Sequence, residues 1–207
     1  MPPRGFARCR RLSFVEPAAG TITTTGVKGF GIGHGVDLFL YNPSTNAQIF
    51  NSGSIITSGD GAVGVLMMGN GGELTNSGLI QTAGGSSDVG PLGTLAASAV
   101  LAVGDNLVIA NMIGGRMIAT GADTPAVQIN DRNLVDQVPT FVSTPQADLS
   151  ATLINLGRIE GTTTAIACGQ GAETIINRGV IIGNVLLGDG ADLYIAGAGG
   201  RLTGEVR

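Results

Sequence analysis

The sequence predicts an all-β protein, namely a right-handed parallel β-helix of about eight turns with three short strands in each turn. Three observations lead to this prediction. The segment Asn155-Leu-Gly-Arg-Ile159 returns 22 residues later as Asn177-Arg-Gly-Val-Ile181. Apolar residues occur in short packets bounded by Gly, Asn and Thr, as expected for short strands separated by turns. No segment shows the 3.6-residue apolar period of a helix.

Each turn repeats three elements in a fixed order. In the clearest early turn they are Asn51-Ser-Gly-Ser-Ile55, Ala62-Val-Gly-Val65 and Gly69-Asn-Gly-Gly-Glu73, and Asn76 opens the next turn after 25 residues. Equivalent strands of a β-helix stack about 4.8 Å apart, so about eight turns would give a rod roughly 40 Å long. Glycine is expected at the corners because it accepts a positive φ.

Asparagines recur at the opening position of the turn. Asn tolerates the backbone of a turn, and stacked side-chain amides can bond to one another from one strand to the next. We therefore expect a ladder of hydrogen-bonded amides that runs through the stack. Its members are Asn51, Asn76, Asn111, Asn155 and Asn177.

The chain divides into an irregular basic segment, residues 1–20, and a repeat domain, residues 21–207. Two insertions interrupt the repeat, at about 84–95 and at 131–147, and we expect both to project from corners of the stack. Loops on a rigid scaffold often carry binding. The second insertion is therefore the first candidate recognition surface, through Asp131, Arg132 and Asp136, and the first insertion is the second candidate.

The composition argues against several classes of partner and location. The net charge is −4 and Lys28 is the only lysine, whereas a nucleic-acid partner requires a basic face. The uncharged run from Val89 to Gly104 contains Pro91 and three glycines, and no membrane span is expected. No apolar stretch follows Arg4–Arg11 to complete a signal peptide, so the sequence as given predicts no export signal.

Few residues suggest catalysis. The only histidine, His34, lies between glycines and is expected in a turn, and it leaves a serine nucleophile without an evident base. Two cysteines, Cys9 and Cys168, predict neither a disulfide framework nor a zinc site. The nearest approach to the charged cluster of a β-helical polysaccharide lyase or glycoside hydrolase is the set Asp131, Arg132 and Asp136.

One corner has features of a calcium site. Gly188-Asp-Gly-Ala-Asp192 resembles half of the calcium-binding repeat Gly-Gly-x-Gly-x-Asp, and Asp189 and Asp192 could offer oxygens to Ca²⁺. Such sites need successive short repeats that share the ion. The copies here are about 20 residues apart, and others carry Asn70 or Gln170. We therefore expect a glycine corner with a solvated acid, and no cofactor.

Several segments resemble the passenger-domain repeats of bacterial autotransporters, the type V secreted proteins of Gram-negative outer membranes. They are the Asn-Ser-Gly-x-Ile segments, Asn177-Arg-Gly-Val-Ile-Ile-Gly-Asn-Val185 and Leu187-Gly-Asp-Gly-Ala-Asp192. The resemblance covers about residues 30–207 and is strongest over 155–207. It implies a β-helical adhesin or stalk that a C-terminal β-barrel carries to the cell surface or releases. The sequence departs from that pattern in having no signal peptide and no barrel, which implies a fragment of a parent protein.

The sequence thus predicts a non-enzymatic structural or adhesive passenger segment, with a host or bacterial surface glycan or protein as partner. A β-helical polysaccharide lyase or glycoside hydrolase fragment remains an alternative, and a calcium-stiffened repeat protein is another. Clustered carboxylates on one face would favour the enzyme, and uniform stacked rows would favour the scaffold. Unpaired strand edges at the two ends also predict end-to-end self-association.

Overall fold

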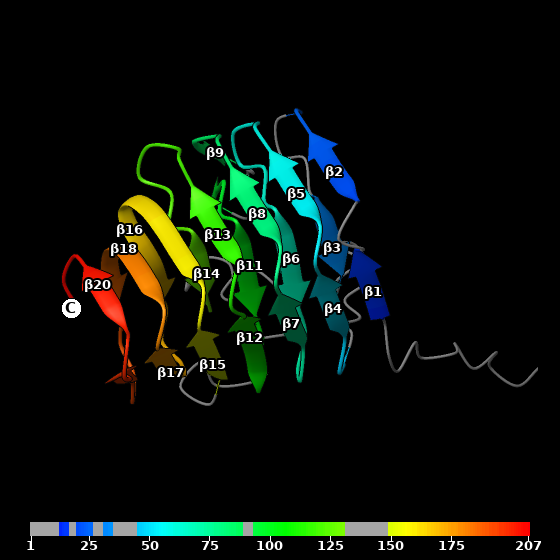
Figure 1. Cartoon of the computed structure of the whole chain (residues 1–207). Coiled ribbons are helices and arrows are strands. Elements are labelled where there is room, and N and C mark those ends of the chain that lie inside the picture. Colours follow the sequence, from blue (N-terminus) through cyan, green and yellow to red (C-terminus); the bar gives the residue numbers. More distant parts are fainter. Residues whose placement is uncertain (1–12, 17–19, 27–30, 35–44, 89–92, 131–148) are drawn as a thin grey trace, which may run out of the picture.

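The protein is all-β, and most of its strands pair in parallel within two curled sheets (Figure 1). The computed structural model describes residues 13–16, 20–26, 31–34, 45–88, 93–130 and 149–207. Within these ranges no helix has the length and apolar character needed to cross a membrane. The expectation of an all-β chain of parallel strands is confirmed, and the arrangement is consistent with a parallel β-solenoid.

The first sheet contains seven strands whose order in space is their order in the sequence. Every neighbouring pair in it is parallel, so the chain must leave the sheet and return between strands. The strands are β1 (Ser13–Glu16), β4 (Gln48–Asn51), β7 (Glu73–Asn76), β12 (Leu107–Asn111), β15 (Ser150–Asn155), β17 (Ala172–Asn177) and β19 (Leu193–Ala196).

The second sheet receives the chain after each of these strands, in two rows. The first row is β2 (Thr21–Thr24), β5 (Ser54–Thr57), β8 (Leu79–Thr82), β13 (Arg116–Ala119), β16 (Arg158–Cys168), β18 (Val180–Leu186) and β20 (Arg201–Thr203). The second row is β3 (Ile32–His34), β6 (Val65–Met68), β11 (Val100–Val103) and β14 (Val127–Ile129), and it too ends on β16.

Strand β16 belongs to both rows because it is long enough to cross the face. Its residue Arg158 pairs with Arg116 of β13, and its residue Ile166 pairs with Val127 of β14. The positions that the preceding pass fills with two separate strands, β13 and β14, are therefore filled by the single strand β16. The pairing of β16 with β18 shifts register around Thr164, where the two rows meet.

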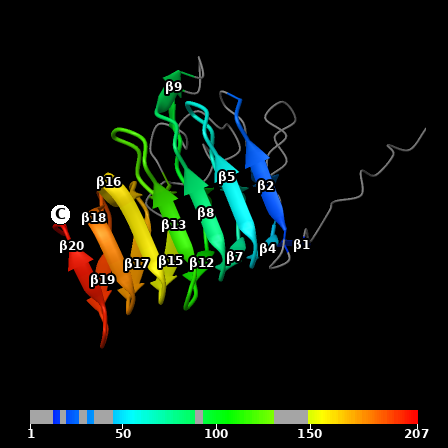
Figure 2. The ribbon, with the colours of Figure 1, turned by 45° about the horizontal axis from the view of Figure 1, so that its top comes forward.

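The interval expected as the first insertion contains a pair of short antiparallel strands, β9 (Ser86–Asp88) and β10 (Thr94–Ala96). In Figure 2, β9 lies beyond the end of β8, at the top of the view. The second expected insertion, residues 131–147, lies entirely outside the described residues. The candidate recognition residues Asp131, Arg132 and Asp136 therefore also lie outside them.

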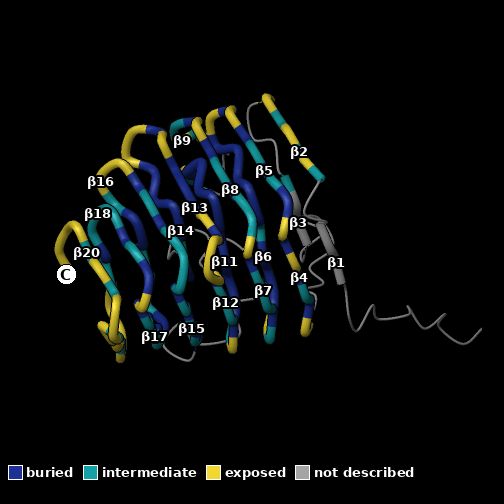
Figure 3. The backbone as a smooth tube through the Cα atoms, viewed as in Figure 1, coloured by how far each residue is buried: buried dark blue, intermediate teal, exposed yellow. Residues whose placement is uncertain are grey.

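The core consists of aliphatic rows enclosed between the sheets. Alternate residues of a strand point to the same side, so register pairing stacks inward side chains from one pass to the next. Figure 3 shows this buried interior along the middle strands and greater exposure in the last pass. Two rows that are at most 1% exposed are Ile49, Leu74, Ile109, Leu153, Ile175 and Ile55, Ile80, Met117, Ile159, Ile181.

A glycine lies at each corner where the chain passes from the first sheet to the second. The N–H of Val180 donates to the carbonyl of Gly157, and a Cβ on Gly179 would collide with that same carbonyl oxygen. A Cβ on Gly157 would likewise meet the carbonyl of Gly115. None of these three has a positive φ. At these three glycines the reason is close stacking of one backbone on another, which excludes a side chain. The expected positive φ does occur at the same corner in other passes, at Gly114 and Gly199.

Candidate functional site

A continuous chain of side-chain hydrogen bonds follows the corner after the first sheet. The amide Nδ2 of Asn51 donates to Oδ1 of Asn76 at 2.7 Å, and Asn76 donates in the same way to Asn111 at 2.9 Å. Asn111 donates to Asn155, and Asn155 to Asn177, each at 2.9 Å. All five residues are buried. Each is the last residue of its strand, so parallel pairing in register places the five amides in one row.

Further contacts satisfy each amide. Nδ2 of Asn111 also donates to the carbonyl of Arg158 at 3.1 Å, and Nδ2 of Asn155 to that of Val180 at 3.2 Å. The ladder ends where Nδ2 of Asn177 donates to the Tyr194 hydroxyl at 3.2 Å. A buried amide without partners would be costly, so these bonds make each pass of the chain depend on the next.

A second buried polar cluster surrounds Glu173 at the start of β17. Its side chain is only 1% exposed. Oε1 accepts a hydrogen bond from Nδ2 of Asn130 at 3.0 Å, and Oδ1 of Asn130 accepts one from the N–H of Gly104 at 2.9 Å. Oε2 of Glu173 is buried and has no partner. The backbone N–H of Glu173 donates to Oδ1 of Asp192 at 2.9 Å.

Register explains why this acid is inside. Glu173 lies four residues before Asn177 and therefore has the same parity along the strand, so it faces the interior with Ile175. In the following pass, Asp192 lies at the level of Glu173, because the next residues of the two segments, Thr174 and Leu193, are register partners. Glu73, by contrast, lies three residues before Asn76 and faces outward. At the level of Glu173 the earlier passes carry Ala47, Gly72, Leu107 and Ala151.

The surroundings favour the protonated form of Glu173. Burial raises the pKa of this carboxyl from 4.5 to about 7, and the charge and hydrogen bonding of Asp192 add to the rise, while the bond from Asn130 opposes it. The pKa of the Cys168 thiol is also raised, first by burial and then by Glu173 and Asp192. A protonated Glu173 becomes a hydrogen-bond donor, and the neighbouring Asp192 carboxylate is a suitable acceptor.

The structure places the other predicted residues as follows. Asp189 is exposed, and its N–H donates to the carbonyl of Gly169. Asp192 is half-buried and uses Oδ1 to hold Glu173, so its carboxylate is not a freely solvated corner acid as expected. In the described ranges, no three His, Cys, Asp or Glu residues gather closely enough to hold a metal ion. The expected turn position of His34 is wrong, because His34 is the last residue of strand β3 and pairs with Met67 of β6. Cys9 and Lys28 lie outside the described residues.

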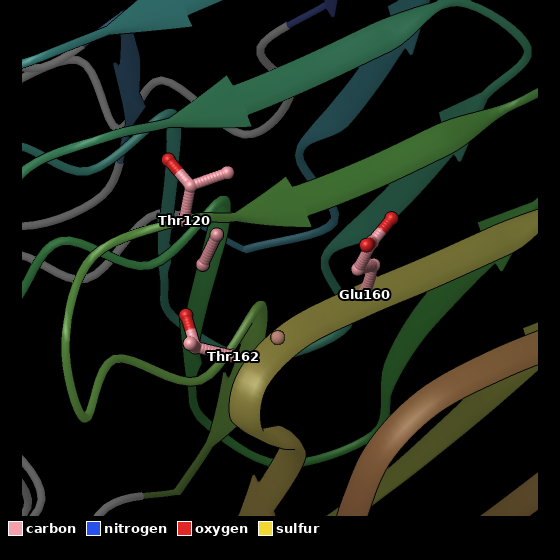
Figure 4. A pocket seen from close by; sticks show the side chains of 5 residues that line it. Thr120, Glu160 and Thr162 are labelled. Carbon is pink, nitrogen blue, oxygen red and sulfur yellow. The ribbon is translucent and has the colours of Figure 1, made fainter. Parts of the chain in front are cut away.

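One shallow hollow of about 200 Å³ lies on the outer side of the second sheet (Figure 4). It is lined by Ala119, Thr120, Glu160, Gly161 and Thr162. The hydroxyl of Thr120 donates to the carbonyl of Thr82, and that of Thr162 to the carbonyl of Gly121. Glu160 is held by Arg158 at 2.7 Å. The polar groups of the hollow are therefore used mainly to join neighbouring strands.

Comparison with known proteins adds no relative: no family model, curated protein or solved structure matches the chain.

Sequence reasoning missed Glu173 and Asn130. Glu173, Glu73 and Asp192 all follow the pattern Gly-x-Gly-x-acid, which predicts a similar corner position for the three acids. The signal that separates them is the distance to the asparagine of the same strand, four residues for Glu173 and three for Glu73. Asn130 had no such signal, because its partner comes from a strand 43 residues away.

Proposed function

We propose that this chain is a non-enzymatic structural segment, a parallel β-solenoid that serves as a rigid stalk or adhesive surface. The observation that carries the proposal is the asparagine ladder. Four successive amide–amide bonds of 2.7–2.9 Å run from β4 to β17 in the buried interior. Such a row stabilises stacking along one axis and leaves the outer faces free to vary.

The finer architecture belongs to the same proposal. We infer that each strand of the seven-stranded sheet marks one coil of a solenoid, so that the described part of the chain would form seven coils, against about eight expected. We also propose the expected right-handed winding, with three main strands in each coil before β16. A solenoid of this kind contacts only its neighbours along the axis, so its length can change without a new core.

The cellular setting follows from the resemblance to autotransporter passenger repeats. The last coils carry the segments that support it most strongly, Asn177-Arg-Gly-Val-Ile181 and Gly188-Asp-Gly-Ala-Asp192. In the structure the first turns from β17 into β18, and the second precedes β19. We infer a parent protein displayed on, or released from, a bacterial outer membrane, in which this segment holds binding surfaces away from the cell. Its partner would be a host or bacterial surface glycan or protein.

The proposal is tested by display and by assay of activity. Residues 1–207 are placed between an export signal and an autotransporter β-barrel and expressed in a Gram-negative host. We expect protease added to intact cells to remove the segment, while a periplasmic marker survives. Retention of the folded segment inside the cell would contradict a passenger role.

The enzyme alternative requires a separate assay with the purified chain. Incubation with a panel of polysaccharides should produce neither new reducing ends nor unsaturated sugars. Cleavage that disappears in the double variant Asp131→Asn, Asp136→Asn would establish a carbohydrate-active enzyme instead. Asp189→Asn serves as the control variant, because Asp189 is an exposed acid in a different coil.

A further inference from the structure

We propose that four arginines at one corner of the stack form a binding surface for a linear sulfated polysaccharide. They are Arg116, Arg158, Arg178 and Arg201. The inference rests on the proposed adhesive function and names the chemical class of its partner. These four and Arg207 are all the lysine and arginine residues that the described ranges contain, so positive charge gathers in the later coils.

Register places three of the four arginines in line. Arg116 of β13 pairs with Arg158 of β16, which pairs with Val180 of β18, which pairs with Arg201 of β20. Each of these positions is the first of its strand, directly after the corner. Neighbouring strands lie about 4.8 Å apart, so three steps separate Arg116 from Arg201 by about 14 Å along the axis.

Arg178 fills the gap left by Val180. It lies in the corner two residues before Val180 and is exposed. Its side chain extends over Gly197 of the following coil, because a Cβ on Gly197 would lie 3.0 Å from Nε of Arg178. Each of the four successive coils from β13 to β20 therefore contributes one arginine to the row.

Most of the row is not neutralised by the protein. Arg116, Arg178 and Arg201 are exposed and make no ion pair with any described residue, whereas Arg158 pairs with Glu160 at 2.7 Å. The chain as a whole carries a charge of −4, so a local row of unpaired guanidinium groups is the exception on this surface. Its charge complements an anionic polymer that runs along the axis.

The chemistry of the row favours sulfate groups on a glycan over nucleic acid. Guanidinium groups bind planar or tetrahedral oxyanions with two parallel N–H donors. Single-stranded nucleic acids also need aromatic platforms on which bases stack. The nearest aromatic side chain by register, Tyr194, is half-buried and accepts a hydrogen bond from Asn177. A chain of regularly spaced sulfates requires only the arginines.

Binding is measured by isothermal titration with heparin as the sulfated probe, at several salt concentrations. We expect affinity to fall as salt rises. The slope of the logarithm of the binding constant against the logarithm of the salt concentration should decrease in magnitude by about one for each arginine removed. The triple variant Arg116→Gln, Arg178→Gln, Arg201→Gln should bind at least about tenfold more weakly. The single variant Arg178→Gln should also bind more weakly than wild type, and Arg207→Gln is its matched control, since it removes one arginine charge beyond the row, where Arg207 pairs with Glu205.

Three results would overturn the proposal. They are wild-type protein that does not bind heparin at low salt, a triple variant that binds as well as wild type, and an Arg207→Gln variant that loses as much affinity as the triple variant. Equal binding of a single-stranded oligonucleotide would also contradict a preference for glycans. Circular dichroism of each variant establishes that it is folded. Failure of binding with an intact fold and normal surface display rejects this inference and leaves the structural role standing.

Discussion

Nδ2 of Asn130 donates a hydrogen bond of 3.0 Å to Oε1 of Glu173, and this contact joins the residue after β14 to the buried start of β17. The same asparagine accepts from the N–H of Gly104, so it connects three passes of the chain. It satisfies only one oxygen of the carboxyl, since Oε2 is buried without a partner. A proton on that oxygen would satisfy it, which makes this part of the fold sensitive to pH.

We expect stability to fall as pH rises through the window set by Glu173. The folded pKa of about 7 lies above the ordinary value of 4.5, so between these values the folded state holds a proton that the unfolded state has lost. The contribution is fully present below about pH 4.5 and lost once pH exceeds about 7, and its size is on the order of 1–3 kcal/mol.

Urea unfolding at pH 4.5 to 8 measures this effect. Glu173→Gln should remove it, because an amide can donate to Asp192 at every pH, and the variant should be more stable than wild type at pH 8. Asp189→Asn changes an exposed acid of the next corner and should keep the wild-type dependence of unfolding free energy on pH. An unchanged slope in Glu173→Gln would show that the carboxyl is not protonated in the fold.

Breaking the ladder in its middle should destabilise the whole stack. In Asn111→Ala, Nδ2 of Asn76 loses its amide acceptor, and Oδ1 of Asn155 and the carbonyl of Arg158 lose the donor that Asn111 provides. Losing these three hydrogen bonds should cost about 2–4 kcal/mol of unfolding free energy in chemical denaturation. The control is Asn184→Ala, which removes a single exposed bond from the N–H of Glu205 and should cost less than about 1 kcal/mol. Equal losses in the two variants would argue against a special role for the ladder.

The corner glycines should tolerate no side chain. Gly179→Ala would place a Cβ against the carbonyl of Gly157 and should cost about 2 kcal/mol or more, seen as a lower melting temperature. Gly26→Ala provides the comparison, because nothing lies within 4 Å of the added Cβ. Its melting temperature should match that of the wild type or rise slightly. A Gly179→Ala protein of unchanged stability would mean that the coils do not stack this closely.

Calcium should not stabilise the corner at Gly188–Asp192. Oδ1 of Asp192 already accepts a hydrogen bond from the N–H of Glu173, and Asp189, the residue before Gly190, is exposed. We therefore expect the same melting temperature in millimolar calcium and in excess chelator, since a ligand that binds only the folded state would raise it. A rise with calcium that Asp192→Asn abolishes would support the calcium-stiffened alternative.

The sequence was sufficient for features that depend on local repetition. The parallel pairing of β15 with β17 and the stacking of Asn155 on Asn177 follow from one spacing of 22 residues, since the motif has the same parity in both copies. Glycine at 157 and 179 could also be expected, although the physical reason was different. These features repeat, so a single copy explains the others.

Features that arise between distant segments could not be read in the same way. The hydrogen bond to Oε1 of Glu173 comes from Asn130, which reaches it from another sheet. The arginine row required the register of β13, β16, β18 and β20, in which Arg116 and Arg158 stand 42 residues apart in the chain. The spacing between copies varies through corners and insertions, so sequence distance alone does not align these side chains.

The central claim, that coils stack in register along one axis, is tested most directly by distances between nitroxide spin labels at the exposed corner positions. Pairs at Ser77 and Arg178, Ser52 and Arg178, and Ser52 and Ala198 span three, four and five coils by register. Pulsed electron paramagnetic resonance should give separations that increase by about 5 Å from each pair to the next, near 14, 19 and 24 Å. Separations that do not increase in this order, or one broad distribution for all three pairs, would contradict the stacked solenoid.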